Sequence, residues 1–193
     1  MGKDIKKRER ILKAATTVIA QKGYHGTKIA DVAKLAGVAD GTIYLYFKNK
    51  DEILLTILSE ALGKLNKKLA SQLESLSETE TKIKKIIEHH FEFIAQNDSL
   101  AQVFQIELRG CSTFMRGGVF PELRDYLKII EEVISYGIKR ERINEDIDIK
   151  ITAKAIFGTL DELSTIWVLR KKHPIEKMTE TVFELFCNGL LKK

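Results

Sequence analysis

Hydroxyl, amide and basic groups gather between residues 37 and 50, in a pattern suited to binding a nucleic acid. Ile43 and Phe47 are four residues apart, so on a helix they share one face and can anchor it to a core. The positions beside that face carry hydrogen-bonding side chains: Asp40, Thr42, Tyr44 and Tyr46. Gly37 precedes them, where the tight turn between two helices often adopts a positive φ. The spacing predicts a helix-turn-helix whose second helix offers polar tips to the major groove of DNA.

A second group of residues could bind backbone phosphates. Lys50 would stand in the first turn of the next helix, where a cation opposes the helix dipole, so another interaction must favour it. Asn49 and Glu52 have the spacing of an N-cap and its return partner, and the amides of that helix start could hold a phosphate together with Lys48 and Lys50. A basic cluster near the N-terminus predicts further phosphate contacts that read no bases: Lys3, Lys6, Lys7, Arg8 and Arg10.

The distribution of charge supports this placement. The whole chain of 193 residues has a net charge of +5. Residues 1–50 contain 11 Lys and Arg against 4 Asp and Glu, whereas the remaining 143 residues contain 21 against 23. The first quarter of the chain is therefore the part suited to a polyanion.

Apolar residues recur at helical spacing along the whole chain, without strand alternation or an internal repeat. The expected fold is all-α, with on the order of nine helices. The predicted helices cover residues 5–22, 28–36, 40–47, 50–76, 79–97, 99–110, 121–142, 149–171 and 175–191. Gly23 is the expected stop of the first helix and Thr27 the expected N-cap of the second. Residues 1–50 would form a three-helix helix-turn-helix DNA-binding domain, which the long helix joins to a ligand-binding and dimerisation domain at 51–193.

Other classes of protein find little support in the composition. The chain is 44% hydrophobic and 31% charged, which is typical of a globular protein, and it lacks an apolar run of roughly 20 residues and a signal-peptide pattern. We therefore expect an unprocessed cytoplasmic protein. No catalytic motif is found, so we expect no enzyme and no catalytic residue.

The cysteines and histidines do not indicate a metal centre. Cys111 and Cys187 are far apart and predict free thiols in a reducing compartment, although nearby arginines leave a redox role for Cys111 open. His89 and His90 would point about 100° apart on a helix, so they rarely share an ion. We therefore expect no metal site.

The run from Gly37 to Lys50, GVADGTIYLYFKNK, closely resembles the signature of TetR-family repressors. The resemblance covers about the first 55 residues. It implies phosphate contacts by Thr42, Tyr44, Tyr46 and Lys50, base contacts by Asp40 and Gly41, and DNA contacts by Thr27 and Lys28 at the start of the preceding helix. Ala39 stands where many members have a capping serine, so Asp40 is the candidate cap, and specificity would then depend more on Lys28, Thr42 and DNA shape.

Two later segments, QIELR at 105–109 and IFGTLDE at 156–162, followed by Trp167, are similar to the fatty-acid-degradation (FadR-like) repressors of Gram-positive and related bacteria. That resemblance implies release from DNA by long-chain acyl-CoA as the effector, with no other cofactor. Such a ligand needs an apolar tunnel beside cations that receive its phosphates. The candidate ligand-binding residues are Phe91, Phe104, Leu108, Arg109, Arg116, Phe157 and Trp167.

The last two predicted helices carry broad apolar faces. These include Ile151, Ala155, Leu163, Met178, Val182, Leu185, Phe186 and Leu190. Paired about a twofold axis, they would form a four-helix interface of a homodimer, with Gly158 and Gly189 allowing close approach. A dimer would bind a pseudo-palindromic double-stranded operator with half-sites about 34 Å apart.

Two alternatives stay open. The protein could be a TetR-like repressor of efflux or stress genes that responds to another lipophilic small molecule. It could also be an acyl-CoA-binding carrier or enzyme that does not bind DNA.

Overall fold

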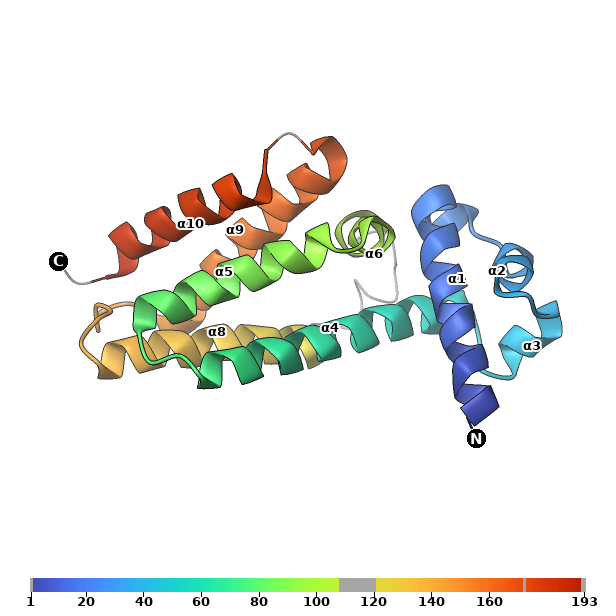
Figure 1. Cartoon of the computed structure of the whole chain (residues 1–193), viewed down its shortest axis with the longest axis horizontal. Helices are drawn as coiled ribbons and strands as arrows, with labels where there is room; N and C mark the ends of the chain where they lie inside the picture. The colour runs from blue at the N-terminus through green and yellow to red at the C-terminus, as the bar shows by residue number, and fades with distance from the viewer. Residues whose placement is uncertain (1, 108–120, 172, 192–193) are drawn as a thin grey trace. The chain divides into compact units, whose positions relative to one another are not determined.

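The computed structural model describes residues 2–107, 121–171 and 173–191. Within these ranges every regular element is a helix (Figure 1), which confirms the predicted all-α fold. An isolated antiparallel bridge within the described ranges pairs Ile143 with Leu191.

The helices begin and end near the predicted residues. They are α1 Gly2–Gly26, α2 Ile29–Ala36, α3 Asp40–Tyr44, α4 Lys50–Glu74, α5 Thr79–Ala95, α6 Asp98–Gln102, the π-helical turn η1 Val103–Glu107, α8 Pro121–Lys139, α9 Ile149–Arg170 and α10 Ile175–Leu190. Gly23, with φ of 73°, breaks the helical geometry of α1 at the predicted stop. The segment predicted as one helix at 99–110 contains a change of helix type instead, because α6 passes into the wider turn η1.

The chain divides into two compact units, Met1–Ala61 with Asn97–Phe120, and Leu62–Gln96 with Pro121–Lys193. Helix α4 contributes residues to both units. In the first unit α6 and η1 pack on α1, although they lie far from it in sequence. The division into a DNA-binding domain at 1–50 and a second domain at 51–193 stays a prediction, because compact units do not show which segments fold independently.

The first unit has a core made by one face of each of its helices. Its buried residues include Ile11, Leu12, Ala15 and Ile19 from α1, Val32, Ala33 and Ala36 from α2, and the predicted anchors Ile43 and Phe47 at α3. Ile53, Leu54, Ile57 and Leu58 from α4 join them, and Val103 of η1 completes the cluster. This packing holds the helix-turn-helix on α1 and α4, because short helices gain most of their stability from tertiary contacts.

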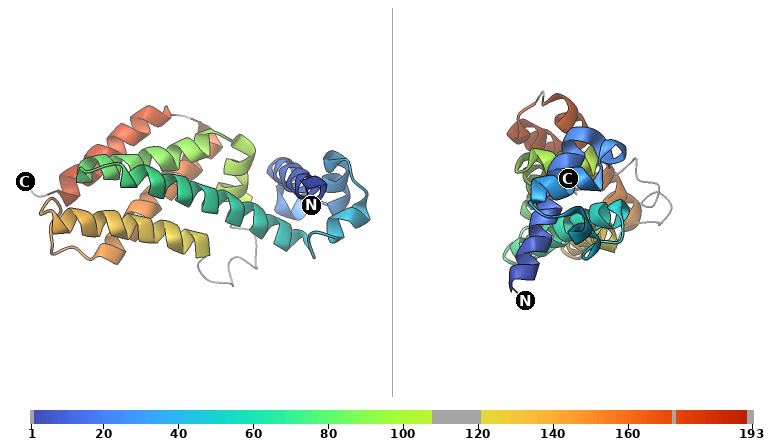
Figure 2. Two further views of the ribbon diagram at one scale, coloured as in Figure 1. Left: turned by 60° about the horizontal axis from the view of Figure 1, so that its bottom comes forward. Right: turned by 90° about the vertical axis from the view of Figure 1, so that its right-hand side faces the viewer.

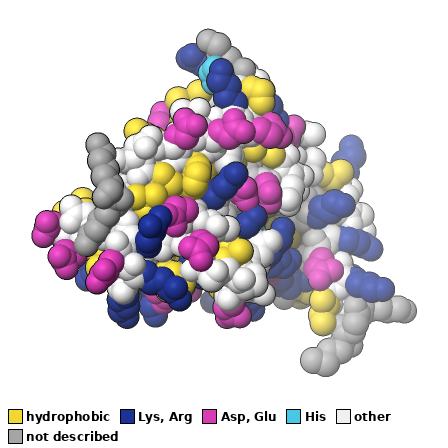
Figure 3. Space-filling model, turned by 60° about the vertical axis from the view of Figure 1, so that its left-hand side comes forward, with side chains coloured by type: hydrophobic (Ala, Val, Ile, Leu, Met, Phe, Trp, Pro, Cys, Tyr) yellow, Lys and Arg dark blue, Asp and Glu magenta, His cyan; other side chains and the backbone are white. Residues whose placement is uncertain are grey.

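The second unit is built around α5, which contacts α8, α9 and α10. Figure 1 and the left view of Figure 2 show α5 with α10 on one side and α8 on the other. Its buried residues include Ile87 and Phe91, both fully inaccessible. Charged side chains cover much of the outer surface, where they surround smaller hydrophobic patches on the face drawn in Figure 3.

Gly137 of α8 lies in close contact with Ile143 and Thr79. A Cβ atom at Gly137 would lie 2.5 Å from Cδ1 of Ile143 and 2.7 Å from Cγ2 of Thr79. Gly137→Ala should therefore lower the free energy of unfolding by about 1–3 kcal/mol, because a packed core has no room for the added methyl group. Urea unfolding at fixed protein concentration measures the loss.

Gly63→Ala is the matched control, because a Cβ atom at Gly63 meets nothing within 4 Å in the middle of α4. The higher helix propensity of alanine should leave this variant equal to the wild type or up to about 1 kcal/mol more stable. Equal stabilities for the two alanine variants would contradict the close packing at Gly137.

Candidate nucleic-acid interface and ligand region

Gly37 forms the predicted turn between α2 and α3. It has φ of 64° and ψ of 44°, the left-handed conformation, and its N–H donates to the Lys34 carbonyl. The guanidinium of Arg10 reaches the same turn and donates to the carbonyls of Ala36 at 3.0 Å and Gly37 at 3.4 Å. The sequence assigned Arg10 to phosphate binding, but in the structure it also stabilises the end of α2.

Helix α3 packs on the core through its apolar face and exposes its polar face to solvent. Ile43 and Phe47 are buried, as predicted, whereas Tyr44 is 57% exposed. Asp40 and Gly41 are also exposed and Thr42 is half-buried. The outer face of α3 therefore offers a hydroxyl-rich surface, and its contacts with DNA stay a prediction.

Two expected helix caps are wrong. Ala39, not Asp40, occupies the N-cap position of α3, and it makes no side-chain cap. The N-cap of α2 is Lys28, again without a side-chain cap, because the buried Thr27 hydroxyl donates to the Gly23 carbonyl at 2.7 Å instead. The Asp40 carboxylate therefore does not cap α3. The Thr27 side chain stabilises the turn at the end of α1.

Lys50 lies in the first turn of α4, where its charge opposes the helix dipole, and contacts with α1 and the turn after it compensate for this. Its Nζ donates to the carbonyls of Tyr24 at 2.6 Å and Thr27 at 3.1 Å, and lies 4.4 Å from the centre of the Tyr24 ring. The carbonyl end of a helix attracts cations, so α1 compensates for the opposing dipole of α4. Sequence reasoning missed this role, and the proposed phosphate contact of Lys50 stays a prediction beside it.

The start of α4 has the predicted cap. The Asn49 side chain accepts from the Glu52 amide at 2.8 Å, and the Glu52 carboxylate accepts from the Lys48 amide at 2.6 Å. Nearby, the Tyr46 hydroxyl donates to the carboxylate of Asp4, and this bond raises the pKa of Tyr46 above its usual value. Tyr46 is therefore tied to the start of α1 in the free protein.

The basic N-terminal cluster divides into tethered and exposed side chains. Arg8 forms a 2.5 Å ion pair with Glu60, and its guanidinium lies 5.5 Å from the centre of the Phe47 ring. Lys6 of this cluster is exposed, and so is Lys28 at the start of α2. The exposed lysines are the ones available to phosphates.

The predicted ligand-binding residues fall in different parts of the chain. Phe91 and Phe157 belong to the second unit, and both rings lie within 6.3 Å of the His90 ring, centre to centre. Phe104 packs against the core of the first unit, and Trp167 donates to the His173 carbonyl at 3.1 Å. The remaining predicted residues, Leu108, Arg109 and Arg116, lie outside the described residues, as does Cys111. A shared tunnel for the set stays a prediction.

His90 gives this region its main polar feature. Its Nδ1 lies 3.0 Å from the Tyr126 hydroxyl, and burial, with a smaller effect of His89, lowers the pKa of His90 to about 3. Burial also raises the pKa of Tyr126. The Nε2 atom of His90 is buried without a hydrogen-bond partner in the described part of the chain. Sequence reasoning considered His90 only as a metal ligand and missed its place among the aromatic rings.

Neither a metal centre nor a membrane-spanning helix is found among the described residues. No group of three or more His, Cys, Asp and Glu side chains there could hold a metal ion. Among the same residues, no helix is long and apolar enough to cross a membrane.

A helix-turn-helix with an exposed polar face, followed by a helical bundle, is typical of DNA-binding regulatory proteins. Residues 11–57 match the bacterial regulatory proteins of the tetR family, and residues 58–189 match the C-terminal region of YsiA-like proteins. The chain therefore belongs to the tetR family of bacterial regulatory proteins, as its sequence signature predicted.

Similar proteins narrow the class further. The fatty acid metabolism regulator protein of Bacillus subtilis is 36% identical over 95% of both chains. The structure of the fatty acid degradation regulator FadR from Bacillus halodurans has a TM-score of 0.90 at 36% identity, covering 95% of both chains. FadR from Bacillus subtilis in complex with stearoyl-CoA has a TM-score of 0.88 at 36% identity, covering 94% of this chain and 98% of that one. The resemblance to fatty-acid-degradation regulators is thus confirmed.

The burial of His90 predicts how stability depends on pH. An unfolded histidine binds a proton below its usual pKa of about 6.5, whereas folded His90 resists it down to pH about 3. Stability should be complete above pH 6.5 and fall as the pH drops toward 3. Between pH 7 and 5 the wild type should lose about 2 kcal/mol more than His90→Gln, which cannot titrate.

Urea unfolding at each pH, at one protein concentration, provides the measurement. His173→Gln is the control, because His173 is exposed and its removal should leave the pH dependence of the wild type intact. A His90→Gln variant with the same pH dependence as the wild type would contradict the assignment.

Proposed function

We propose that this protein is a cytoplasmic repressor of fatty-acid-degradation genes that long-chain acyl-CoA releases from its operator. The observation that carries the proposal is the 36% identity to the Bacillus subtilis fatty acid metabolism regulator, which extends over 95% of each chain. The similarity includes the second half, where tetR-family effector regions are expected to diverge. We propose no catalytic activity.

The DNA contacts would come from the outer surface of the helix-turn-helix. The proposed residues are Thr27, Lys28, Asp40, Gly41, Thr42, Tyr44, Tyr46 and Lys50. Tyr44 and Lys28 are exposed and need no rearrangement to reach a phosphate. Lys50 and Tyr46 would have to exchange a contact within the protein for one with DNA, or act by holding α1 and α4 in place.

The effector would bind in the second half of the chain. Support comes from the relative whose structure contains stearoyl-CoA and whose fold matches at a TM-score of 0.88. An acyl chain would have to open the aromatic cluster of Phe91, His90 and Phe157, because Phe91 is fully buried. Arg109 and Arg116 stay the sequence-based candidates for binding its phosphates. A different lipophilic effector remains the second candidate, and the binding experiment below distinguishes the two.

A homodimer through α9 and α10 would present two helix-turn-helix surfaces to one operator. Ile151, Leu169 and Leu185 are each more than 60% exposed on these helices, as an unpaired apolar face would be. Gly158 and Gly189 have open space at the Cβ position. The inward residues Met178 and Val182, which the sequence grouped with this face, are buried in the core of their own chain and cannot join the interface.

Release would act through α4, which contributes to both compact units. A ligand that prefers the state with poorly spaced recognition helices by about 3 kcal/mol would weaken operator binding roughly a hundredfold. The residues at the start of α4, Lys50 and Asp51, contact Tyr24 of α1, so a shift of α4 would reach the helix-turn-helix.

Tyr44→Ala tests the DNA surface. The variant should bind operator DNA at least tenfold more weakly than the wild type at one salt concentration, because it loses a hydroxyl directed at a phosphate. Fluorescence anisotropy with labelled operator measures the change. Lys177→Ala is the control, because this exposed lysine lies on α10. Equal affinities for the two variants would favour the carrier or enzyme that does not bind DNA.

Palmitoyl-CoA tests the effector. Saturating palmitoyl-CoA should weaken operator binding roughly a hundredfold in the same assay, whereas coenzyme A without an acyl chain should leave it unchanged. Calorimetric titration of the protein without DNA gives the affinity of each compound independently. Unchanged operator binding with bound palmitoyl-CoA would exclude release by acyl-CoA and favour another lipophilic effector.

A further inference from the structure

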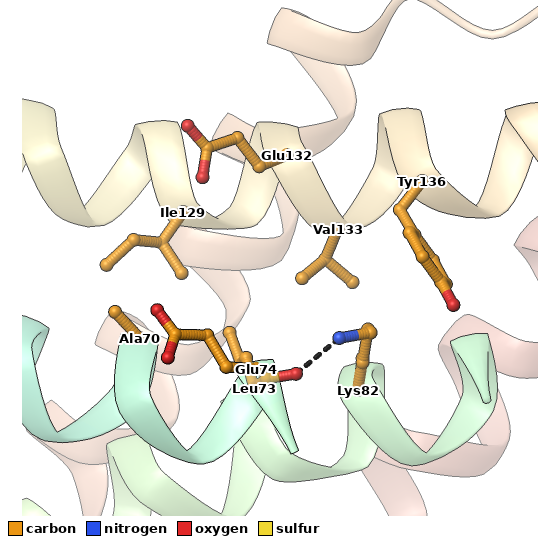
Figure 4. A pocket seen from close by; sticks show the side chains of 8 residues that line it. All are labelled: Ala70, Leu73, Glu74, Lys82, Ile129, Glu132, Val133 and Tyr136. Carbon is orange, nitrogen blue, oxygen red and sulfur yellow. Dashed lines mark hydrogen bonds between the residues drawn. The ribbon is translucent and has the colours of Figure 1, made fainter. Parts of the chain in front are cut away.

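A cavity of about 250 Å³ opens between α4, α5 and α8 of the second unit, apart from the aromatic cluster around His90 (Figure 4). It carries ionisable side chains of both signs. Lys82 from α5 stands at one end, and Glu74 of α4 and Glu132 of α8 also line it. Ile129 and Val133 form an apolar wall between the charged groups.

The ammonium group of Lys82 is unusually well buried for a charge. The residue is 9% exposed, its Nζ donates to the carbonyl of Leu73, and it lies 4.9 Å from the centre of the Tyr136 ring. An ammonium has three N–H donors, so this carbonyl uses one of them. Within the described residues no carboxylate forms a salt bridge with Lys82. The Leu73 carbonyl at the end of α4 and the Tyr136 ring offset part of this charge, and the two remaining N–H donors could bind an incoming anionic group.

The acidic side chains restrict which anion can enter. Figure 4 shows the carboxylate of Glu74 below Ile129 and the ammonium of Lys82 below Val133, whereas the carboxylate of Glu132 points away from both. The Glu132 side chain is 66% exposed and is 4.0 Å from Lys128. A simple anion would be repelled by these carboxylates, and a simple cation would be repelled by Lys82. A molecule with a carboxylate at one end and an ammonium at the other would pair with both.

We propose that this cavity binds a small ω-amino acid. Its carboxylate contacts Lys82, its aliphatic carbons lie against Ile129 and Val133, and its ammonium contacts Glu74. The cavity volume suits a metabolite of this size rather than an acyl-CoA. The site requires neither DNA nor the acyl-CoA effector, so it can be tested independently of the proposed function.

Calorimetric titration of the full chain with 6-aminohexanoate tests the proposal. Binding should saturate at one molecule per chain. Hexanoate and hexylamine each lack one charge, and each should bind at least tenfold more weakly. Norleucine, whose charges are adjacent, should also bind at least tenfold more weakly. No binding of 6-aminohexanoate, or equal binding of any of these analogues, would overturn the proposal.

Two variants locate the site within the cavity. Glu74→Gln should weaken 6-aminohexanoate at least tenfold while strengthening hexanoate, because the repelling charge is removed and the exposed side chain is dispensable for folding. Lys82→Met should abolish the binding of 6-aminohexanoate, with circular dichroism to check the fold. Lys67→Met is the control, because this exposed lysine of α4 does not line the cavity. Unchanged affinity in Glu74→Gln would place any binding elsewhere, whatever the fate of Lys82→Met.

Discussion

The carbonyl groups that end α1 need hydrogen-bond donors, and the side chain of Lys50 provides them from the start of the next long helix. The same residue of α1 that accepts from Lys50, Tyr24, also donates its hydroxyl to Asp51 and its amide to Glu107. Tyr24 therefore joins three segments: α1, the start of α4 and the π-helical turn η1. The position of the helix-turn-helix within its unit depends on this junction, because α2 follows directly from it.

That junction also explains a lysine that local rules disfavour. A cation in the first turn of a helix opposes its dipole, and Asp51 and Glu52 beside it satisfy the same dipole well. Because the ammonium lies against the carbonyl end of α1 and the face of the Tyr24 ring, it is stabilised by two neighbouring elements at once. The Lys50 ammonium lies at the carbonyl end of α1. Lys50 can therefore serve both folding and phosphate binding only if DNA approaches that end of α1.

Sequence patterns predicted the features that depend on near neighbours. The helical periods, the turn at Gly37, the anchors Ile43 and Phe47 and the Asn49–Glu52 cap all concern residues a few positions apart, and the structure contains each of them. The contacts of Arg10, which span 26 residues, could not be predicted in this way. The N-caps predicted for α2 and α3 were wrong although their residues are local, and at α2 the reason is that the folded turn brings the Gly23 carbonyl to the Thr27 hydroxyl.

The same limit applied to the ligand region and the dimer face. Helical spacing identifies a residue as apolar and inward but cannot tell which neighbour it packs against. Phe104 was grouped with Phe91, yet it packs against the core of the first unit. Met178 and Val182 were grouped with Leu185, although they point into their own chain. Helices α9 and α10 are apolar on more than one face, so periodicity alone could not separate the core from an interface.

The capping of α3 bears directly on how DNA sequence could be read. Had Asp40 capped the helix, its carboxylate would have been bound to backbone amides and lost to the groove. With Ala39 at the N-cap, Asp40 is an exposed helical residue whose carboxylate can only accept hydrogen bonds. In the major groove a carboxylate pairs with the amino group of cytosine, while it is repelled by phosphates. If α3 enters the major groove as proposed, an operator that places cytosine opposite Asp40 would be favoured, and Gly41 beside it would allow close approach of the backbone to that base pair.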